Sequence, residues 1–230
     1  MTEQTVPVLS PAAVRRRRME KLRDSALYLC TDARVEQGDL AEFLTQAFEG
    51  GVDIIQLRDK KISAADEIAA LELLKSLAEK YDRLFAVNDR ADIALLVGAD
   101  IFHVGQDDLT PAQARSLLGE GVLIGRSTHS PAQAQEAMDN SEVDYFACGP
   151  VWETPTKPGR AATGTEYLQY VADSQTEKPW FAIGGVNLDT AAEVVDAGAS
   201  RIVVVRALTE ASEVVTTATA LREALTAKES

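Results

Sequence analysis

Two cations and an amide stand close together where an early apolar run of this sequence ends, in QLRDK at 56–60. At the two-residue period of a β-strand, Gln56, Arg58 and Lys60 face one way, whereas Asp59 faces the other. Two cations and an amide on one side suit a polyanion such as a pyrophosphate. The alternative is an ordinary solvated strand end.

Two carboxylates follow the next two apolar runs. Asp89 comes directly after Leu84–Asn88, and Asp108 closes the polar segment after Ile101–Gly105. If these runs are neighbouring parallel strands, their carboxyl ends meet and the two carboxylates converge. Two carboxylates, together with phosphate oxygens and water, make a Mg²⁺ site. The alternative is that Asp107 or Asp108 begins the following turn.

Hydroxyls and a lysine follow the fifth and sixth runs. Ser127, in GRSTH at 125–129, suits donation to a phosphate or a leaving group, and His129 is either an acid/base or a structural residue. The next loop, stiffened by prolines and glycines, carries two hydroxyls and an ammonium, those of Thr154, Thr156 and Lys157. Hydroxyls and an ammonium on such a loop are typical of an anion-binding site.

Glycines and an arginine follow the seventh and eighth runs, as Gly184-Gly185 and as Val205-Arg206. Glycines let a phosphate approach backbone N–H groups, although two adjacent glycines also make a tight turn. In many barrels of eight strands the phosphate site follows strands seven and eight. The sequence therefore predicts two anion sites, with room between them for a reaction between two phosphorylated small molecules.

No candidate nucleophile is paired with an obvious base, so covalent catalysis is not expected. With a metal ion and cations around a pyrophosphate, the simplest chemistry is the departure of this group. Mg²⁺ and the cations Arg58, Lys60 and Lys157 would stabilise the charge that develops on the departing oxygens.

Eight short β-branched or aromatic runs recur along the chain, and helical patterns separate them. Nearly continuous apolar runs are expected of parallel strands buried on both faces. The predicted strands are Ala26–Thr31, Val52–Leu57, Leu84–Asn88, Ile101–Gly105, Val122–Arg126, Tyr145–Pro150, Trp180–Gly184 and Arg201–Val205. The predicted helices include Ala12–Asp24, Asp39–Glu49, Ser63–Lys80, Leu188–Asp196 and Thr209–Ala227, with further helix starts capped by Thr110 and Ser130.

Eight β-α units in series predict an α/β fold, a (β/α)₈ TIM barrel with an extra N-terminal helix. An eight-stranded doubly wound sheet is the alternative, and in either fold ligands bind at the carboxyl ends of the strands. The sequence has no linker or break in composition after the first strand begins. We therefore expect an N-terminal extension at 1–25 and one catalytic barrel domain at 26–230.

The composition of the 230 residues, 46% hydrophobic and 26% charged, is that of a soluble globular protein and excludes disorder or a membrane span. The net charge of −13 argues against nucleic-acid and anionic-membrane partners, but a local basic pocket still accepts small anions. Cys30 and Cys148 stand in apolar runs and are expected in the core. Because the sequence shows no signal-peptide pattern, the expected location is cytoplasmic. The sequence does not determine the oligomeric state, and a homo-oligomer is one alternative.

Read in order, the strand ends resemble those of the thiamine-phosphate synthase (thiamine-phosphate pyrophosphorylase) family in its actinobacterial form. The matching segments are QLRDK at 56–60, ND at 88–89, GADIFHVGQDDL at 98–109, GRSTH at 125–129, GPVWETPTKPG at 149–159, PWFAIGG at 179–185 and GASRIVVVRAL at 198–208. Each segment alone is a weak signal, but the ordered set is specific.

The resemblance implies a transferase that uses Mg²⁺. It would join 4-amino-5-hydroxymethyl-2-methylpyrimidine pyrophosphate to 4-methyl-5-(2-phosphonooxyethyl)thiazole, giving thiamine phosphate and pyrophosphate. In this dissociative substitution the pyrophosphate leaves first, and the thiazole nitrogen then captures the resulting pyrimidine-methyl cation.

The resemblance also implies residue roles. Gln56 would touch the pyrimidine, and Asp89 and Asp108 would bind Mg²⁺. Arg58, Lys60, Asn88, Ser127 and Lys157 would hold the pyrophosphate, while Thr154, Thr156, Gly185, Val205 and Arg206 would line the thiazole-phosphate site. Many family members have Ser where this chain has Arg206, which either binds the phosphate more strongly or points away from it.

Two other functions fit the same barrel. A related thiazole tautomerase would use His129 as its acid/base, but it has no pyrophosphate for Arg58, Lys60 and Lys157 to bind. A non-catalytic sensor that binds one phosphorylated metabolite would not need so many charged side chains at the ends of the strands.

Overall fold

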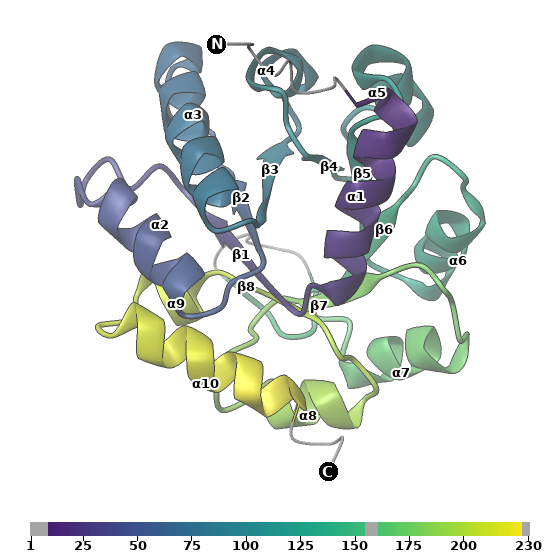
Figure 1. Cartoon of the computed structure of the whole chain (residues 1–230). Helices are drawn as coiled ribbons and strands as arrows, with labels where there is room; N and C mark the ends of the chain where they lie inside the picture. The colour runs from purple at the N-terminus through teal and green to yellow at the C-terminus, as the bar shows by residue number, and fades with distance from the viewer. Residues whose placement is uncertain (1–8, 155–160, 227–230) are drawn as a thin grey trace, which may run out of the picture.

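The computed structural model describes residues 9–154 and 161–226, and its eight strands are parallel and pair in chain order. Because β8 also pairs with β1, with Leu27 opposite Ile202, the sheet closes on itself. Figure 1 shows this closed barrel inside a ring of helices. The strands are β1 (Leu27–Thr31), β2 (Ile54–Leu57), β3 (Leu84–Asn88), β4 (Ile101–Val104), β5 (Leu123–Thr128), β6 (Tyr145–Cys148), β7 (Trp180–Ile183) and β8 (Ile202–Val204). The predicted TIM barrel is confirmed, and the doubly wound alternative is wrong.

The helices alternate with the strands, as predicted, and an extra one precedes β1. They are α1 (Pro11–Asp24), α2 (Leu40–Glu49), α3 (Ala64–Lys80), α4 (Ala91–Val97), α5 (Pro111–Leu118), α6 (Pro131–Asp139), α7 (Thr165–Asp173), α8 (Ala191–Asp196), α9 (Arg206–Thr209) and α10 (Val214–Thr226). Thr110 and Ser130 cap α5 and α6 with their side chains, as their sequence patterns predicted. No helix in the described ranges is long and apolar enough to cross a membrane.

The last predicted helix, Thr209–Ala227, is confirmed as α10 over Val214–Thr226, but its predicted start is wrong, because the chain forms the short α9 and then turns before α10. Leu208 and Val214 are both buried. In one straight helix these two residues would point roughly 120° apart, since successive residues are ~100° apart. The turn at residues 210–213 lets both side chains pack against the barrel.

The apolar side chains form two cores, one on each face of the sheet. Inside the barrel, side chains such as Ile54, Leu84 and Phe181 pack with Tyr28 and Tyr145. Outside, the other side chains of the strands pack against the helices. Both cysteines are buried, as expected, and burial raises the pKa of the Cys148 thiol to about 12.

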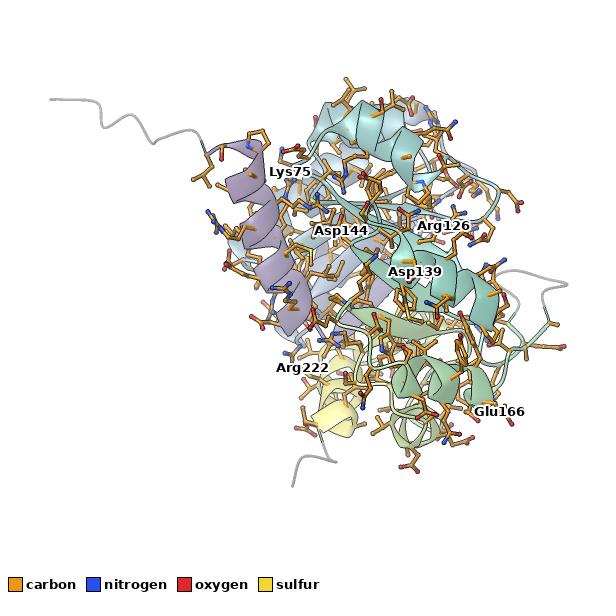
Figure 2. The ribbon with its side chains drawn as sticks, turned by 90° about the vertical axis from the view of Figure 1, so that its right-hand side faces the viewer. Lys75, Arg126, Asp139, Asp144, Glu166 and Arg222 are labelled. Atoms are coloured by element: carbon orange, nitrogen blue, oxygen red, sulfur yellow. The ribbon has the colours of Figure 1, made fainter. Side chains whose placement is uncertain are left out.

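The extra helix α1 covers the amino-terminal end of the barrel. Its Leu22 is fully buried with the interior cluster. Arg15 pairs with Asp144, and Arg18 pairs with Asp100, which stand just before β6 and β4. In the side view of Figure 2, α1 lies along one side of the molecule, nearer to the labelled Asp144 than to Arg126. The ion pairs of Arg15 and Arg18 therefore hold this helix on the barrel, opposite the carboxyl ends of the strands.

Candidate active site

A cavity of about 200 Å³ lies beyond the carboxyl ends of β2 and β3. The sequence predicted four of its lining residues as neighbours of an anion or a metal: Arg58, Lys60, Asn88 and Asp89. Asp59 also lines this cavity, although the strand alternation predicted that it faces away. The alternation fails there because β2 ends at Leu57, and the residues beyond it follow a loop.

Arg58 offers a cation to this cavity. Its side chain is half-buried, and among residues 9–154 and 161–226 no carboxylate forms an ion pair with it. Its backbone N–H donates to the Thr31 carbonyl at 2.8 Å, which fixes the start of the loop after β2. A partly buried guanidinium without a carboxylate partner is suited to bind an anion.

Asp89 is held in an uncommon conformation at the end of β3. Its φ of 40° lies in the left-handed region, which costs energy for a residue other than glycine. Its backbone N–H donates to the His103 carbonyl at 3.1 Å, and its Oδ2 pairs with Lys60 Nζ at 2.7 Å. Oδ1 of this carboxylate has no hydrogen-bond partner among the described residues.

Asp108 closes the turn after β4, since its Oδ2 accepts the Gly105 backbone N–H at 2.7 Å. The sequence alternative was that Asp107 or Asp108 begins the following turn, whereas Asp108 closes a turn that starts at Gly105. Oδ1 of Asp108 lacks a partner in the described part of the chain, so one oxygen of each candidate carboxylate is available for a cation. Within that part, no cluster of three or more metal-binding side chains is present.

Two charged residues that the sequence did not single out also line this first cavity. Glu67 is buried at the start of α3, and burial raises the pKa of its carboxyl group while Arg90 opposes that shift. Arg90 pairs with Asp92 at 2.7 Å. Nothing in the sequence distinguishes Glu67 from an ordinary acidic residue in the first turn of a helix.

A second cavity, of about 280 Å³, lies at the carboxyl ends of β5 to β8. Five of the predicted site residues line it, namely Ser127, Thr154, Gly185, Val205 and Arg206. His129 also lines it, and its Nδ1 contacts the Gly149 carbonyl oxygen. Thr156 and Lys157 lie outside the described residues.

The two glycines after β7 make a tight turn that also forms a wall of this second cavity. Gly184 and Gly185 have φ values of 100° and 77°, in the region that favours glycine. A Cβ on Gly185 would lie 2.8 Å from Cβ of Trp152, so the turn packs directly against the loop after β6. The tight turn and the cavity wall are therefore the same feature.

A chain of hydrogen bonds crosses the interior of the barrel and joins the two cavities, and the sequence analysis missed it. From one end to the other it links Asn88, Gln56, Tyr28, Tyr145, His103 and Ser127, with contacts of 2.8 to 3.1 Å. All but Asn88 are buried. A signal was available, because the six residues, one on each of β1 to β6, share the two-residue alternation of the interior core.

Gly125 makes room for the middle of this chain. It lies opposite Tyr145 in the pairing of β5 with β6. A Cβ at position 125 would lie 2.2 Å from the Tyr145 ring. The glycine of the GRSTH segment therefore lets the Tyr145 hydroxyl reach His103, two strands away.

A family model described as thiamine monophosphate synthase matches residues 27–208, which run from β1 to the middle of α9. The chain belongs to the thiamine monophosphate synthase family. The predicted family and the predicted transferase class are thereby confirmed. The family match covers every strand of the barrel, the lining of the first cavity, and the lining of the second cavity except Glu210.

Named relatives agree with the family. The chain is 53% identical over 211 residues to the thiamine-phosphate synthase of Saccharopolyspora erythraea, covering 89% of this chain and 95% of that protein. It is 54% identical over 209 residues to that of Thermobifida fusca, covering 90% and 95%. A solved structure of the thiamine phosphate pyrophosphorylase from Pyrococcus furiosus matches with a TM-score of 0.79 at 32% identity, covering 90% of this chain and 96% of that one.

Proposed function

We propose that this chain joins 4-amino-5-hydroxymethyl-2-methylpyrimidine pyrophosphate to 4-methyl-5-(2-phosphonooxyethyl)thiazole and releases thiamine phosphate and pyrophosphate. The observation that carries the proposal is the presence of two cavities at one end of the barrel. One has cations and carboxylates, and the other has glycines, hydroxyls and an arginine. The test is a coupling assay with both substrates, for which the expected product is thiamine phosphate.

The first cavity is the pyrophosphate subsite in this proposal. Arg58 and Lys60 bind the phosphate oxygens as charged donors, and the Asn88 amide adds a neutral contact. The Ser127 hydroxyl contributes to the pyrophosphate from the second cavity, which it lines. Lys157, which follows β6 in the sequence, would supply a further cation. As the C–O bond to the pyrimidine methylene breaks, its electron pair moves onto the pyrophosphate, and these groups stabilise that charge.

Asp89 and Asp108 are the residues that would hold Mg²⁺. They fit such a role, because each keeps one oxygen without a partner in the described part of the chain, and Mg²⁺ commonly binds through one or two carboxylates plus substrate phosphates. When bound, the ion supplies positive charge to the pyrophosphate oxygens. Lys60 then exchanges its Asp89 partner for a substrate phosphate.

The second cavity takes the thiazole phosphate. Gly185 and Val205 line it after strands β7 and β8, where many (β/α)₈ barrels bind phosphate. Thr154, Thr156 and Arg206 add hydroxyl and guanidinium donors. Held there, the thiazole nitrogen attacks the pyrimidine methylene carbon, and its lone pair forms the new C–N bond.

Asp89→Asn is expected to raise the Mg²⁺ concentration needed for half-maximal activity by roughly tenfold or more, because the amide brings no negative charge to the cation. A Mg²⁺ titration of the initial rate measures this. Asp107→Asn is the matched control, since Asp107 is an exposed neighbour in the turn after β4. Equal titrations for the Asp89 variant and the unaltered chain would remove Asp89 from the metal site.

The position of His129 in the second cavity favours one other function, that of a thiazole tautomerase with this residue as acid/base. His129→Ala is expected to lower the rate of thiamine phosphate formation less than ~10-fold, because our proposal gives the imidazole no part in proton transfer. Rates of coupling and of thiazole tautomerisation are measured for both proteins. Tautomerisation that the substitution abolishes would support the alternative.

A further inference from the structure

The interior chain of hydrogen bonds has a direction, and the Gln56 amide fixes it. Gln56 Nε2 donates to Asn88 Oδ1 at 2.9 Å, so its Oε1 accepts from the Tyr28 hydroxyl at 2.8 Å. A hydroxyl has one proton, so Tyr145 must donate to Tyr28 across their 3.1 Å contact. By the same count, Tyr145 accepts from Nδ1 of His103 at 2.9 Å.

The other end of the chain follows from this direction. A neutral imidazole that donates from Nδ1 is an acceptor at Nε2, so the Ser127 hydroxyl donates to Nε2 at 2.9 Å. Burial raises the pKa of both tyrosines, which keeps one proton on each hydroxyl. Without ligand, Ser127 therefore points its proton into the barrel, away from any phosphate in the cavity.

We propose that His103 and Tyr145 are positioning residues that couple the two ends of the pyrimidine pyrophosphate substrate. When a phosphate oxygen accepts a hydrogen bond from the Ser127 hydroxyl, the direction of every hydrogen bond in this interior chain reverses. The inference rests on the proposed function, which gives Ser127 to the pyrophosphate and Gln56 to the pyrimidine. It adds a connection between these two contacts through three buried side chains, those of Tyr28 on β1, Tyr145 on β6 and His103 on β4.

The reversal follows from the same count of protons. If Ser127 donates outward, its oxygen accepts from Nε2 of His103, so Nδ1 accepts from Tyr145. Tyr145 then accepts from Tyr28, and Tyr28 accepts from the Gln56 amide nitrogen, which requires the Gln56 amide to turn over. The Asn88 amide turns over with it, so that Asn88 Nδ2 donates to Gln56 Oε1 where Asn88 Oδ1 accepted before. Each hydroxyl and the imidazole keep one proton, and the ring proton moves from Nδ1 to Nε2 by exchange with water.

The arrival of pyrophosphate therefore changes which atoms of Gln56 face their neighbours. A pyrimidine ring has a fixed pattern of donors and acceptors, so one orientation of the amide matches it better than the other. Because these side chains are buried, each hydrogen bond that is left unmade costs free energy. Reversal of all the hydrogen bonds is therefore favoured over the loss of one of them.

The test is the protonation of the His103 ring, read by ¹⁵N NMR on the full chain labelled at histidine. The sequence has two histidines, so a His129→Gln variant assigns the signals. Spectra are recorded with Mg²⁺ alone and with Mg²⁺ plus inorganic pyrophosphate, whose binding is followed independently by calorimetry. The expected result is a proton on Nδ1 without pyrophosphate and on Nε2 with it.

Tyr145→Phe removes the hydroxyl at the centre of the hydrogen-bond chain and keeps the aromatic ring. We expect it to abolish the change of tautomer and to lower kcat about tenfold, with the KM for thiazole phosphate unchanged. Tyr167→Phe is the matched control. Its buried hydroxyl donates to Thr128 on β5 at 2.7 Å, but Tyr167 belongs to the outer core. This control should keep the change of tautomer and the kcat.

The outcomes separate the two proposals. If pyrophosphate binds and the His103 tautomer is unchanged, or the ring is doubly protonated in both states, the coupling is overturned while the pyrophosphate subsite stands. If inorganic pyrophosphate does not bind with Mg²⁺ present, the proposed subsite fails and the coupling fails with it. An equal loss of kcat in the Tyr145 and Tyr167 variants would also overturn the coupling, because it would show a general effect on the core.

Discussion

Arg58→Ala is expected to lower kcat/KM for thiamine phosphate formation by about 100-fold or more, the scale at which charge-assisted contacts to a leaving group act. Arg58 lies in the first cavity, and no carboxylate in the described residues pairs with it. The substitution therefore removes a cation from the anion site without leaving a buried carboxylate unpaired. Steady-state rates with each substrate varied in turn measure the effect.

Two further variants make the test specific to this guanidinium. Arg58→Lys keeps the charge but loses the fork of N–H donors, so its rate should lie between those of the Ala variant and the unaltered chain. Lys61→Ala removes an exposed cation three residues away that does not line the cavity, and it should keep nearly full activity. Unchanged kinetics in Arg58→Ala would exclude this residue from the pyrophosphate subsite.

Asp53→Asn is expected to cause the largest loss of stability, about 3–5 kcal/mol, because it removes the charge from a buried carboxylate with several partners. Asp53 Oδ1 pairs with Arg83 at 2.5 Å, and Oδ2 pairs with Arg222 at 2.6 Å. Oδ2 also accepts the backbone N–H groups of Ala26 and Leu27. The side chain, 3% exposed, thus joins β1 and β2 to α10.

Thermal and urea unfolding measure this effect. For a chain of this length, 3–5 kcal/mol corresponds to a fall in Tm of roughly 6–20 °C. Asp82→Asn is the matched control, because its side chain is 73% exposed while it also pairs with two cations, Arg17 and Lys21. Exposed pairs contribute about 0–1 kcal/mol. Equal losses in the two variants would contradict the role given to the buried ion pairs.

The strands and their order could be predicted because each is a short apolar run between helices. Leu84–Asn88 was predicted with the bounds that the structure has, and the capping patterns at Thr110 and Ser130 located two helices. The grouping of Arg58, Lys60, Asn88 and Asp89 followed from the geometry of parallel strands, whose ends meet at one mouth. These features depend on local sequence and on chain order.

The features that the sequence did not reveal depend on contacts between distant residues. Both faces of a barrel strand are apolar, so the sequence alone did not show that Tyr28 and Tyr145 point inward and meet. The start of β2 at Ile54 instead of Val52 and the extension of β5 to Thr128 depend on pairing with neighbouring strands. The turn between α9 and α10 depends on which residues the barrel surface buries.

The decisive measurement is a coupling assay with the purified full chain, both phosphorylated substrates and Mg²⁺, run with and without EDTA. We predict equal amounts of thiamine phosphate and pyrophosphate with Mg²⁺, and no product with EDTA until excess Mg²⁺ is added back. Product in EDTA at the full rate would contradict the role given to Asp89 and Asp108. No product from folded protein and both substrates under any of these conditions would contradict the proposed function itself.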